Sequence, residues 1–439
     1  MTTSPWVIPP STLRWLEEIP TDRPVAMLIR HSVRGPLPEG DAGYHLPITE
    51  AGHELARTLG ARLRGRLRGA HASPLLRTMQ TAERLLEGAR LPGPVTPDTL
   101  LGDPGVFMLD GRAGPYWRGL GQEQMLTHLV EDRPPLPGCA AADPAARFLV
   151  HHMLGSARGV PGVYAFATHD SLVTTTAARM LVQPLGRPDW PWYLEAAFFW
   201  EADGHVQVAY RDHRGARPAP IVGLTEDDVV ALARREAAAT VGLECPARFF
   251  LAGGAFKTLL TGRPPRDLDL WAPSADDRAV LEATLLQRGA EPLPERAYTQ
   301  AFRLGPRVVE LPLHTEPNTL EERLSRFDLA LSAVGAEHLP GDRWRAAIHP
   351  LALASVKQRQ VLLLDELKNW RHGLTSIERL RRYAGELAFE APACEEARLW
   401  SIFDSQSPEV QAVMVQHFRR SARHDQGVAE DLFARGVWS

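Results

Sequence analysis

The sequence predicts an α/β protein of two domains: a three-layer α/β/α domain, then an α+β domain that ends in a helical subdomain. The chain has 439 residues, more than one hydrophobic core normally serves. In its first half, short apolar runs alternate with amphipathic helical patterns, which is typical of a mostly parallel sheet covered on both faces. The second half begins with a few strand patterns and turns largely helical from about residue 319.

The domain boundary is predicted where apolar periodicity stops. The stretch YRDHRGARPAPIVGLTEDD, residues 210–228, is rich in Arg, Gly and Pro. Thr225 precedes a run of acids and then apolar residues at helical spacing, so it should cap the helix that opens the second domain. We therefore expect four segments: a first domain at 1–212, a linker at 213–224, a second domain at 225–318 and a helical subdomain at 319–439.

Composition excludes several classes of protein. With 44% hydrophobic and 23% charged residues the chain is globular, and its net charge of -4 gives no global attraction to nucleic acid or anionic membrane. Its three cysteines lie far apart, which indicates neither a disulfide framework nor a zinc cluster. We see no signal-peptide pattern and no apolar run of membrane-spanning length. A soluble cytoplasmic protein is expected.

Two histidines follow predicted strands of the first half, at the edge of the sheet where ligands bind. His31 ends the run VAMLIRH and lies between Arg30 and Arg34, whereas His169 ends the run GVYAFATH. Arg77 begins a predicted helix in ASPLLRTMQTAERL. An unprotonated histidine nitrogen can attack phosphorus while arginines bind the phosphate oxygens, so these residue types suit phosphoryl transfer to histidine.

These motifs, in this order, resemble the histidine phosphatase superfamily, which includes the phosphoglycerate mutases, over residues 24–210. The resemblance implies that His31 is the phosphate-accepting nucleophile and that no metal takes part. It also implies a phosphate pocket formed by Arg30, Arg34, Arg77 and His169. The sequence departs from the family at Ser32, where glycine is usual.

Two aspartates are candidates for the general acid that protonates the leaving group. One branch of the family uses the aspartate after the second histidine, which is Asp170 here. The other uses an acid beyond the pocket arginine, and LLGDPGVFMLDG offers Asp103. We favour Asp170 from the sequence and keep Asp103 as the alternative.

A second cluster of motifs lies in LAGGAFKTLLTGRPPRDLDLW, residues 251–271. On a strand, Asp267 and Asp269 project from one face, and two such close carboxylates repel unless a cation lies between them. Gly253 and Gly254 leave room for phosphate oxygens close to the backbone. Glu310, within RVVELPL, is placed to complete a two-metal site or to act as a base.

This second cluster resembles the nucleotidyltransferase superfamily of DNA polymerase beta, most closely the poly(A) polymerase and CCA-adding type, over residues 240–390. The segments RFDLALSAVG and TSIERLRRYAGE add to the likeness. The resemblance implies that Asp267, Asp269 and Glu310 bind Mg²⁺ and that Gly253, Gly254 and Lys257 lie by the triphosphate of an NTP. It places Arg326 and Asp328 near the nucleotide. We find no match to the motif with which CCA-adding enzymes read bases.

The two resemblances together predict a bifunctional enzyme, a phosphomonoesterase fused to a Mg²⁺-dependent nucleotidyltransferase. Its expected partners are a phosphorylated small molecule and an NTP, with RNA possible but not favoured and no membrane. One alternative is a nucleotidyltransferase regulated by a catalytically silent phosphate-sensing domain. The other is an enzyme of RNA-end repair, which would bind RNA in a salt-sensitive way.

Overall fold

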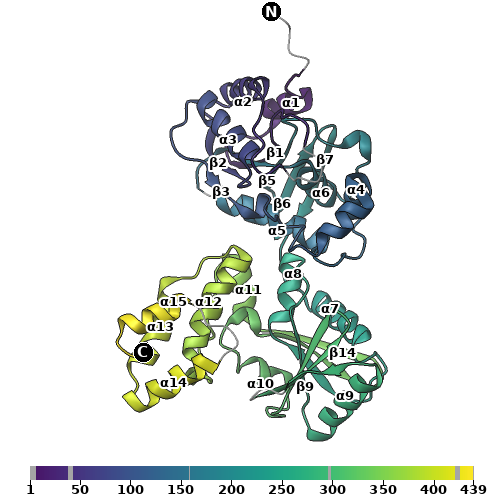
Figure 1. Cartoon of the computed structure of the whole chain (residues 1–439), viewed down its shortest axis with the longest axis vertical. Coiled ribbons are helices and arrows are strands. Elements are labelled where there is room, and N and C mark those ends of the chain that lie inside the picture. Colours follow the sequence, from purple (N-terminus) through teal and green to yellow (C-terminus); the bar gives the residue numbers. More distant parts are fainter. Residues whose placement is uncertain (1–5, 38–42, 158, 295–297, 421–425, 439) are drawn as a thin grey trace, which may run out of the picture. The chain divides into compact units, whose positions relative to one another are not determined.

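The computed structural model describes residues 6–37, 43–157, 159–294, 298–420 and 426–438. The chain folds as two compact units (Figure 1). The first domain runs to Val222 and includes Thr261–Arg263, and the second holds Gly223–Leu260 and the chain from Pro264 onward.

The first domain contains a seven-stranded sheet in the order β3-β2-β4-β1-β5-β6-β7. The strands are β1 (Pro24–Arg30), β2 (Leu67–Ala72), β3 (Thr96–Pro97), β4 (Gly162–Thr168), β5 (Ala196–Ala202), β6 (His205–Tyr210) and β7 (His213–Pro218). Strands β1 to β4 pair in parallel, whereas β5, β6 and β7 add to β1 as antiparallel hairpins. The expectation of a mostly parallel sheet holds for only half of it, because tight turns after Ala202 and Tyr210 leave no room for crossover helices.

Helices cover both faces of this sheet, which confirms the predicted three-layer architecture (Figure 1). Apolar side chains of α1, α2 and α3 form one core with alternate residues of β1, such as Val25, Met27 and Ile29. Helices α5 and α6 contact β1 and β5, and α4 packs on α6. The helical bounds are α1 (Pro10–Glu18), α2 (Glu50–Arg62), α3 (Leu76–Ala89), η1 (Thr99–Leu101), α4 (Ala113–Val130), α5 (Ala142–Ser156), α6 (Asp170–Leu181) and η2 (Arg187–Asp189).

Half of the segment predicted as a linker belongs to the first sheet. Residues His213–Pro218 form β7, which pairs with β6 over its whole length. Alternate residues of β7 are exposed, as is typical of an edge strand, and charged or small residues are tolerated there. The arginine, glycine and proline content of this segment is therefore typical of a linker, although its backbone pairs with β6 along the whole length of β7.

The second domain contains another seven-stranded sheet, in the order β10-β11-β12-β9-β8-β13-β14. Its strands are β8 (Phe249–Ala252), β9 (Leu268–Trp271), β10 (Glu291–Pro292), β11 (Thr299–Leu304), β12 (Arg307–Pro312), β13 (Val334–Leu339) and β14 (Arg343–Ile348). The pairing of β12 with β9 is parallel, and the other described pairings are antiparallel. The sheet is therefore mixed.

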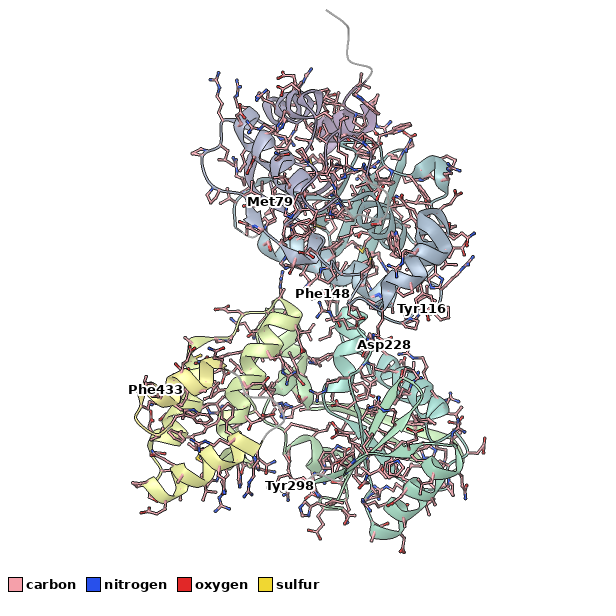
Figure 2. The ribbon with its side chains drawn as sticks, in the orientation of Figure 1. Met79, Tyr116, Phe148, Asp228, Tyr298 and Phe433 are labelled. Atoms are coloured by element: carbon pink, nitrogen blue, oxygen red, sulfur yellow. The ribbon has the colours of Figure 1, made fainter. Side chains whose placement is uncertain are left out.

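The helices of the second domain begin with α7 (Glu226–Ala239), whose N-cap is Thr225 as predicted. Asp228, labelled in Figure 2, lies in the first turn of this helix. The Thr225 hydroxyl accepts a hydrogen bond of 3.1 Å from its backbone N–H. Helices α12 to α15 pack on one another after the sheet is complete. The remaining bounds are η3 (Gly254–Lys257), α8 (Thr258–Thr261), α9 (Ala275–Gln287), α10 (Leu320–Leu324), η4 (Ala330–Ser332), α11 (Pro350–Gln358), η5 (Trp370–His372), α12 (Gly373–Leu387), α13 (Ala393–Asp404), α14 (Pro408–Arg420) and α15 (Gln426–Ala434).

The segment predicted as a helical subdomain, 319–439, contributes two strands to this sheet. Strands β13 and β14 form a hairpin across Pro340, Gly341 and Asp342, and β13 pairs with β8. The Pro-Gly pair is a turn signal that lies between two short apolar runs. The continuous helical region therefore begins only at α11, after the hairpin.

Among the described residues, no helix is both long and apolar enough to cross a membrane.

Candidate active sites

The first candidate site lies at the carboxyl ends of β1 and β4. Arg30 and Thr168 are register partners in these parallel strands, so the residues that follow, His31 and His169, emerge side by side. Their ring centroids are 5.7 Å apart. The N–H of His31 is bound to the carbonyl of Thr168 at 2.8 Å, and the residue is only 3% exposed. The two separate motifs thus meet through strand pairing.

Three arginines surround this histidine pair. Arg77, in the first turn of α3, is buried, and its Nη2 lies 3.4 Å from Nδ1 of His169. Arg30 forms an ion pair of 3.2 Å with Asp170, the first residue of α6. The positive charge of Arg34 acts on both Arg77 and His169 and lowers the pKa of each. The structure therefore brings together His31 and all four residues of the predicted phosphate pocket.

Burial and positive charge keep both imidazoles neutral. Burial lowers the pKa of His31 well below its ordinary value, and the charges of His169 and Arg30 lower it further. Burial, followed by the charge of Arg77, lowers the pKa of His169 to about 3, and burial lowers that of Arg77 to about 10. Such an excess of buried positive charge is relieved when an anion binds.

The hydrogen bonds assign the tautomer of each ring. Nδ1 of His31 lies 2.8 Å from the carbonyl oxygen of Ser32, which can only accept, so Nδ1 carries the proton and Nε2 carries the lone pair. His169 has the opposite arrangement. Its Nδ1 faces the guanidinium of Arg77, which only donates, and its Nε2–H donates to Ser73 Oγ at 3.2 Å.

Ser32, where the family usually has glycine, is accommodated by its neighbours. Its side chain is fully buried, and its Oγ donates a hydrogen bond of 2.8 Å to the carbonyl of Gly52. Its backbone N–H is bound to Oγ1 of Thr81 at 2.9 Å. The hydroxyl therefore has a partner in the adjacent helix and fixes the backbone that follows His31.

The two candidate acids have different surroundings. Oδ2 of Asp170 pairs with Arg30 and accepts a hydrogen bond of 3.0 Å from Gln122, while Oδ1 accepts from the N–H of Ser171 at 2.8 Å. Three donors therefore bind the Asp170 carboxylate. Asp103 accepts from the hydroxyl of Tyr44 at 2.9 Å. It lies beside the pocket, because a side chain at the preceding residue, Gly102, would come within 2.9 Å of Nε2 of His169.

Sequence reasoning missed three side chains of this site: Ser73, Gln122 and Tyr193. Ser73 directly follows β2 and lies four residues before Arg77. A polar residue at the end of a strand could have been predicted as a site residue from the sequence. Tyr193 lies with its ring centroid 5.6 Å from that of His31. Nothing in the local sequence marks Tyr193 or Gln122, because only the tertiary fold brings them to the histidines.

The second candidate site is built on β8, β9 and β12. Asp269 of β9 and Glu310 of β12 are register partners in the parallel pair. Along β9 the residues alternate between buried leucines and partly exposed Asp269 and Trp271, so Asp267 and Asp269 lie on one face as predicted. Gly253, which follows β8, has φ of 107°, and a side chain there would come within 3.4 Å of Oδ2 of Asp269. The glycine therefore opens a space beside the acids.

The charges of these acids repel one another. Burial, followed by the charges of Asp267 and Glu310, raises the pKa of Asp269 to about 7. Asp267 is also bound by Nε of Arg266 at 2.6 Å. In the described part of the chain, no three His, Cys, Asp or Glu side chains are arranged ready to hold a metal ion. The oxygen donors and their repulsion suit Mg²⁺, but the third ligand is not preformed.

A buried polar network adjoins the glycine pair. Asp328 forms an ion pair of 2.8 Å with Arg379 of α12 and accepts a hydrogen bond of 2.6 Å from Ser376. Arg379 also donates to Ser332 Oγ at 3.0 Å. These contacts hold α12 against the segment between α10 and β13, and they connect Asp328 with two residues that the sequence did not single out, Arg379 and Ser376.

Tyr383 joins this network to the glycines. A side chain at Gly254 would come within 2.7 Å of the Tyr383 hydroxyl. The ammonium of Lys257 lies 3.6 Å from the centre of the Tyr383 ring and pairs with Glu386. Although burial alone would raise the pKa of the Tyr383 phenol, the charges of Arg379 and Lys257 lower it. Lys257 is thus held close to Gly254, as predicted.

Arg326 lies apart from this network. It is exposed, and its backbone carbonyl accepts a hydrogen bond of 2.9 Å from the side chain of Asn369. Arg323 is the buried arginine of this segment, with its guanidinium 3.9 Å from the centre of the Trp271 ring. Asp328 and Arg326 were both predicted near the nucleotide. Asp328 belongs to the buried network, whereas the side chain of Arg326 does not.

Comparison with known proteins supports the first resemblance directly. The family model of the histidine phosphatase superfamily (branch 1) matches residues 27–103, a stretch that contains His31, Arg77 and Asp103. This confirms a histidine phosphatase superfamily domain at the N-terminus. No curated protein sequence matches the chain.

Solved structures similar to the chain include two enzymes that act on tRNA and one phosphatase. A tRNA-processing enzyme in its apo form is 18% identical, with a TM-score of 0.35, and the match covers 49% of this chain and 58% of that one. The CCA-adding enzyme of Thermotoga maritima in complex with tRNA is 14% identical, with a TM-score of 0.32 and coverage of 48% and 52%. A phosphoserine phosphatase mutant from Entamoeba histolytica is 14% identical, with a TM-score of 0.33 and coverage of 43% and 97%. The chain thus spans little more than half of each tRNA enzyme.

Proposed function

We propose that the first domain hydrolyses phosphomonoesters through a phosphohistidine at residue 31. The observation that carries this proposal is the neutral, buried His31, whose Nδ1–H is bound by the Ser32 carbonyl and whose Nε2 keeps its lone pair. Nε2 attacks phosphorus and the bond to the leaving oxygen breaks. Water then attacks the phosphohistidine and releases inorganic phosphate. Arg30, Arg34 and Arg77 neutralise the phosphate oxygens in both steps.

We assign the general acid to Asp103 rather than to Asp170. Both oxygens of Asp170 are already occupied by donors, including the guanidinium of Arg30. That arrangement makes Asp170 a residue that positions Arg30. Asp103 has one donor, the Tyr44 hydroxyl, and lies beside Gly102 at the pocket. This reverses the preference drawn from the sequence.

The leaving-group dependence of hydrolysis tests both the reaction and the acid. An aryl phosphate leaves as a stable phenolate and needs little protonation, whereas an alkyl phosphate needs a full proton. We expect Asp103→Asn to lower kcat for an alkyl phosphate by about 10²–10⁴-fold, and kcat for 4-nitrophenyl phosphate far less. Asp170→Asn should affect both substrates similarly, because it releases Arg30.

The steady-state rates of wild type and both variants provide the measurement. If Asp170→Asn, and not Asp103→Asn, gave the selective loss, the sequence-based assignment would be restored. Wild type that hydrolysed neither ester would disprove the phosphatase function.

We propose that the second domain transfers a nucleotidyl group from an NTP to an acceptor oxygen. The observation that carries this proposal is Asp269, a partly buried acid that faces two further carboxylates beside a glycine pair. Asp267 and Asp269 would hold Mg²⁺, with Glu310 as the third carboxylate. When bound, Mg²⁺ neutralises and orients the triphosphate oxygens. The acceptor oxygen attacks the α-phosphorus, and pyrophosphate leaves.

The other residues of this site bind and orient the nucleotide. Gly253 admits a phosphate oxygen close to the backbone, because it has no side chain beside Asp269, whereas the absent side chain of Gly254 leaves room for the Tyr383 hydroxyl. Lys257 supplies a nearby positive charge. The ion pair of Asp328 with Arg379 fixes α12 beside these glycines.

Melting temperatures with each NTP, with and without Mg²⁺, test this function. A ligand at a hundredfold excess over its dissociation constant stabilises the folded state by about 2.7 kcal/mol. We expect a Mg²⁺-dependent rise with at least one NTP, absent from the Asp267→Ala/Asp269→Ala variant. The control, Asp276→Ala, removes an exposed acid of α9 and should keep the rise. An equal rise in the double variant, or none with any NTP, would argue against the site.

A further inference from the structure

Two aromatic rings extend outward from His31, the proposed nucleophile. The ring centroid of Tyr193 lies 5.6 Å from that of His31, and the ring of Trp6 contacts Tyr193 edge to face at 5.5 Å. Trp6 precedes α1 and Tyr193 precedes β5, so segments far apart in the sequence build this row. Trp6 is 40% exposed, whereas His31 is buried, and the row therefore leads from the pocket to solvent.

Arg30 holds the middle ring of this row. Its guanidinium lies 4.5 Å from the centre of the Tyr193 ring and donates to the carbonyl of Pro191, two residues earlier, at 2.7 Å. The same side chain is paired with Asp170 on its other side. Arg30, which belongs to the phosphate pocket, therefore also fixes the Tyr193 ring through a cation–π contact.

A further aromatic ring lies beside the other candidate acid. Tyr44 is 39% exposed and donates its hydroxyl to Asp103. The carbonyl of Gly43, the residue before it, accepts a hydrogen bond of 2.6 Å from Arg77 of the pocket. Aromatic rings are thus joined to the pocket through Arg30 and through Arg77, at two different places on its rim.

We propose that the substrate of the first domain is a nucleoside monophosphate whose base stacks on Trp6. Exposed aromatic rings favour the binding of a planar, apolar group, and any nucleobase can stack on such a ring. The phosphate binds at His31, the sugar passes Tyr193, and the base reaches the partly exposed Trp6. This assignment rests on the proposed phosphatase function and adds its substrate class. A free nucleotide and the phosphorylated end of an RNA strand have the same chemistry here, because in both a single sugar separates the phosphomonoester from the base.

The test compares substrates that differ only in the base. We expect kcat/KM for adenosine 5′-monophosphate to exceed that for ribose 5-phosphate by about 10-fold or more. Trp6→Leu should reduce this ratio to near one, and Trp6→Phe, which keeps a ring, should largely restore it. Tyr164→Leu is the matched control. Tyr164 lies near the start of β4, at the opposite end of the strand from His169, and should leave the ratio unchanged.

A 5′-phosphorylated hexaadenylate identifies the source of the nucleotide, because a higher kcat/KM for it than for the mononucleotide points to an RNA end. Equal kcat/KM for adenosine 5′-monophosphate and ribose 5-phosphate in wild type would overturn the substrate class and leave the phosphatase function intact. A preference that survives Trp6→Leu in a variant of unchanged melting temperature would overturn the role of Trp6. Only a failure to hydrolyse any phosphomonoester would remove the phosphatase function itself.

Discussion

Replacement of His31 by alanine is expected to lower kcat for phosphomonoester hydrolysis by about 10³-fold or more, because removal of a covalent nucleophile leaves only binding and electrostatic effects. The variant should still bind inorganic phosphate, since Arg30, Arg34 and Arg77 remain. Wild type quenched during turnover of a ³²P-labelled substrate should carry acid-labile label on residue 31, and the variant should carry none. Rate and label together identify the nucleophile.

The matched control is His205→Ala, which removes an exposed histidine of the first domain at the start of β6. It should leave both kcat and the labelling unchanged. If His31→Ala hydrolysed an aryl phosphate as fast as wild type does, the pocket would be a phosphate sensor and not a catalyst. A phosphate-sensing domain, the alternative that the sequence left open, would then be the better interpretation.

The geometry of the first pocket followed from rules that act on short stretches of sequence. His31 and His169 each end an apolar strand pattern, and neighbouring parallel strands end at one edge of a sheet, so their proximity was predictable. Arg77 was found in the same way, from its place in the first turn of a helix that follows β2. Residues that reach the site by such regular connections carry a signal in the sequence.

Residues that reach a site from irregular segments carry no such signal. Tyr193 and Trp6 lie on segments without periodicity, and only packing brings them to His31. The choice between Asp103 and Asp170 was equally beyond the sequence, because it depends on donors from Arg30 and Gln122. The same limit applied to the second domain, where the hairpin of β13 and β14 returns to β8 after several intervening strands and helices.

In the second domain, replacement of Asp269 by asparagine is expected to stabilise the metal-free protein while it slows nucleotidyl transfer. Burial and the charges of Asp267 and Glu310 raise the pKa of Asp269 from 3.8 to about 7. Above pH 7 the native state must hold this carboxylate charged at a cost that the unfolded chain does not bear. Asparagine has nearly the same shape and no charge, so it removes that cost.

The effect should depend on pH in a defined direction. Because the folded-state pKa is raised, the unfolded chain binds fewer protons between pH 3.8 and 7, and the stability of wild type falls as pH rises through this window. At pH 8 the penalty reaches as much as ~4 kcal/mol, at 1.36 kcal/mol per pKa unit. We therefore expect Asp269→Asn to melt several degrees above wild type at pH 8, and close to wild type at pH 4.

When Mg²⁺ and the NTP are added at pH 8, wild type should melt above Asp269→Asn. The ligands stabilise wild type by cancelling the repulsion among the acids, whereas the variant has lost a ligand and should not respond. Transfer by the variant should fall by about 10²–10³-fold, in keeping with the several kcal/mol that a metal supplies. Asp276→Asn, an exposed acid of the same domain, should change neither quantity. A metal-free melting temperature at pH 8 that was instead lower for Asp269→Asn than for wild type would mean that the Asp269 carboxylate stabilises the fold. That result would contradict the role of Asp269 as a metal ligand repelled by Asp267 and Glu310.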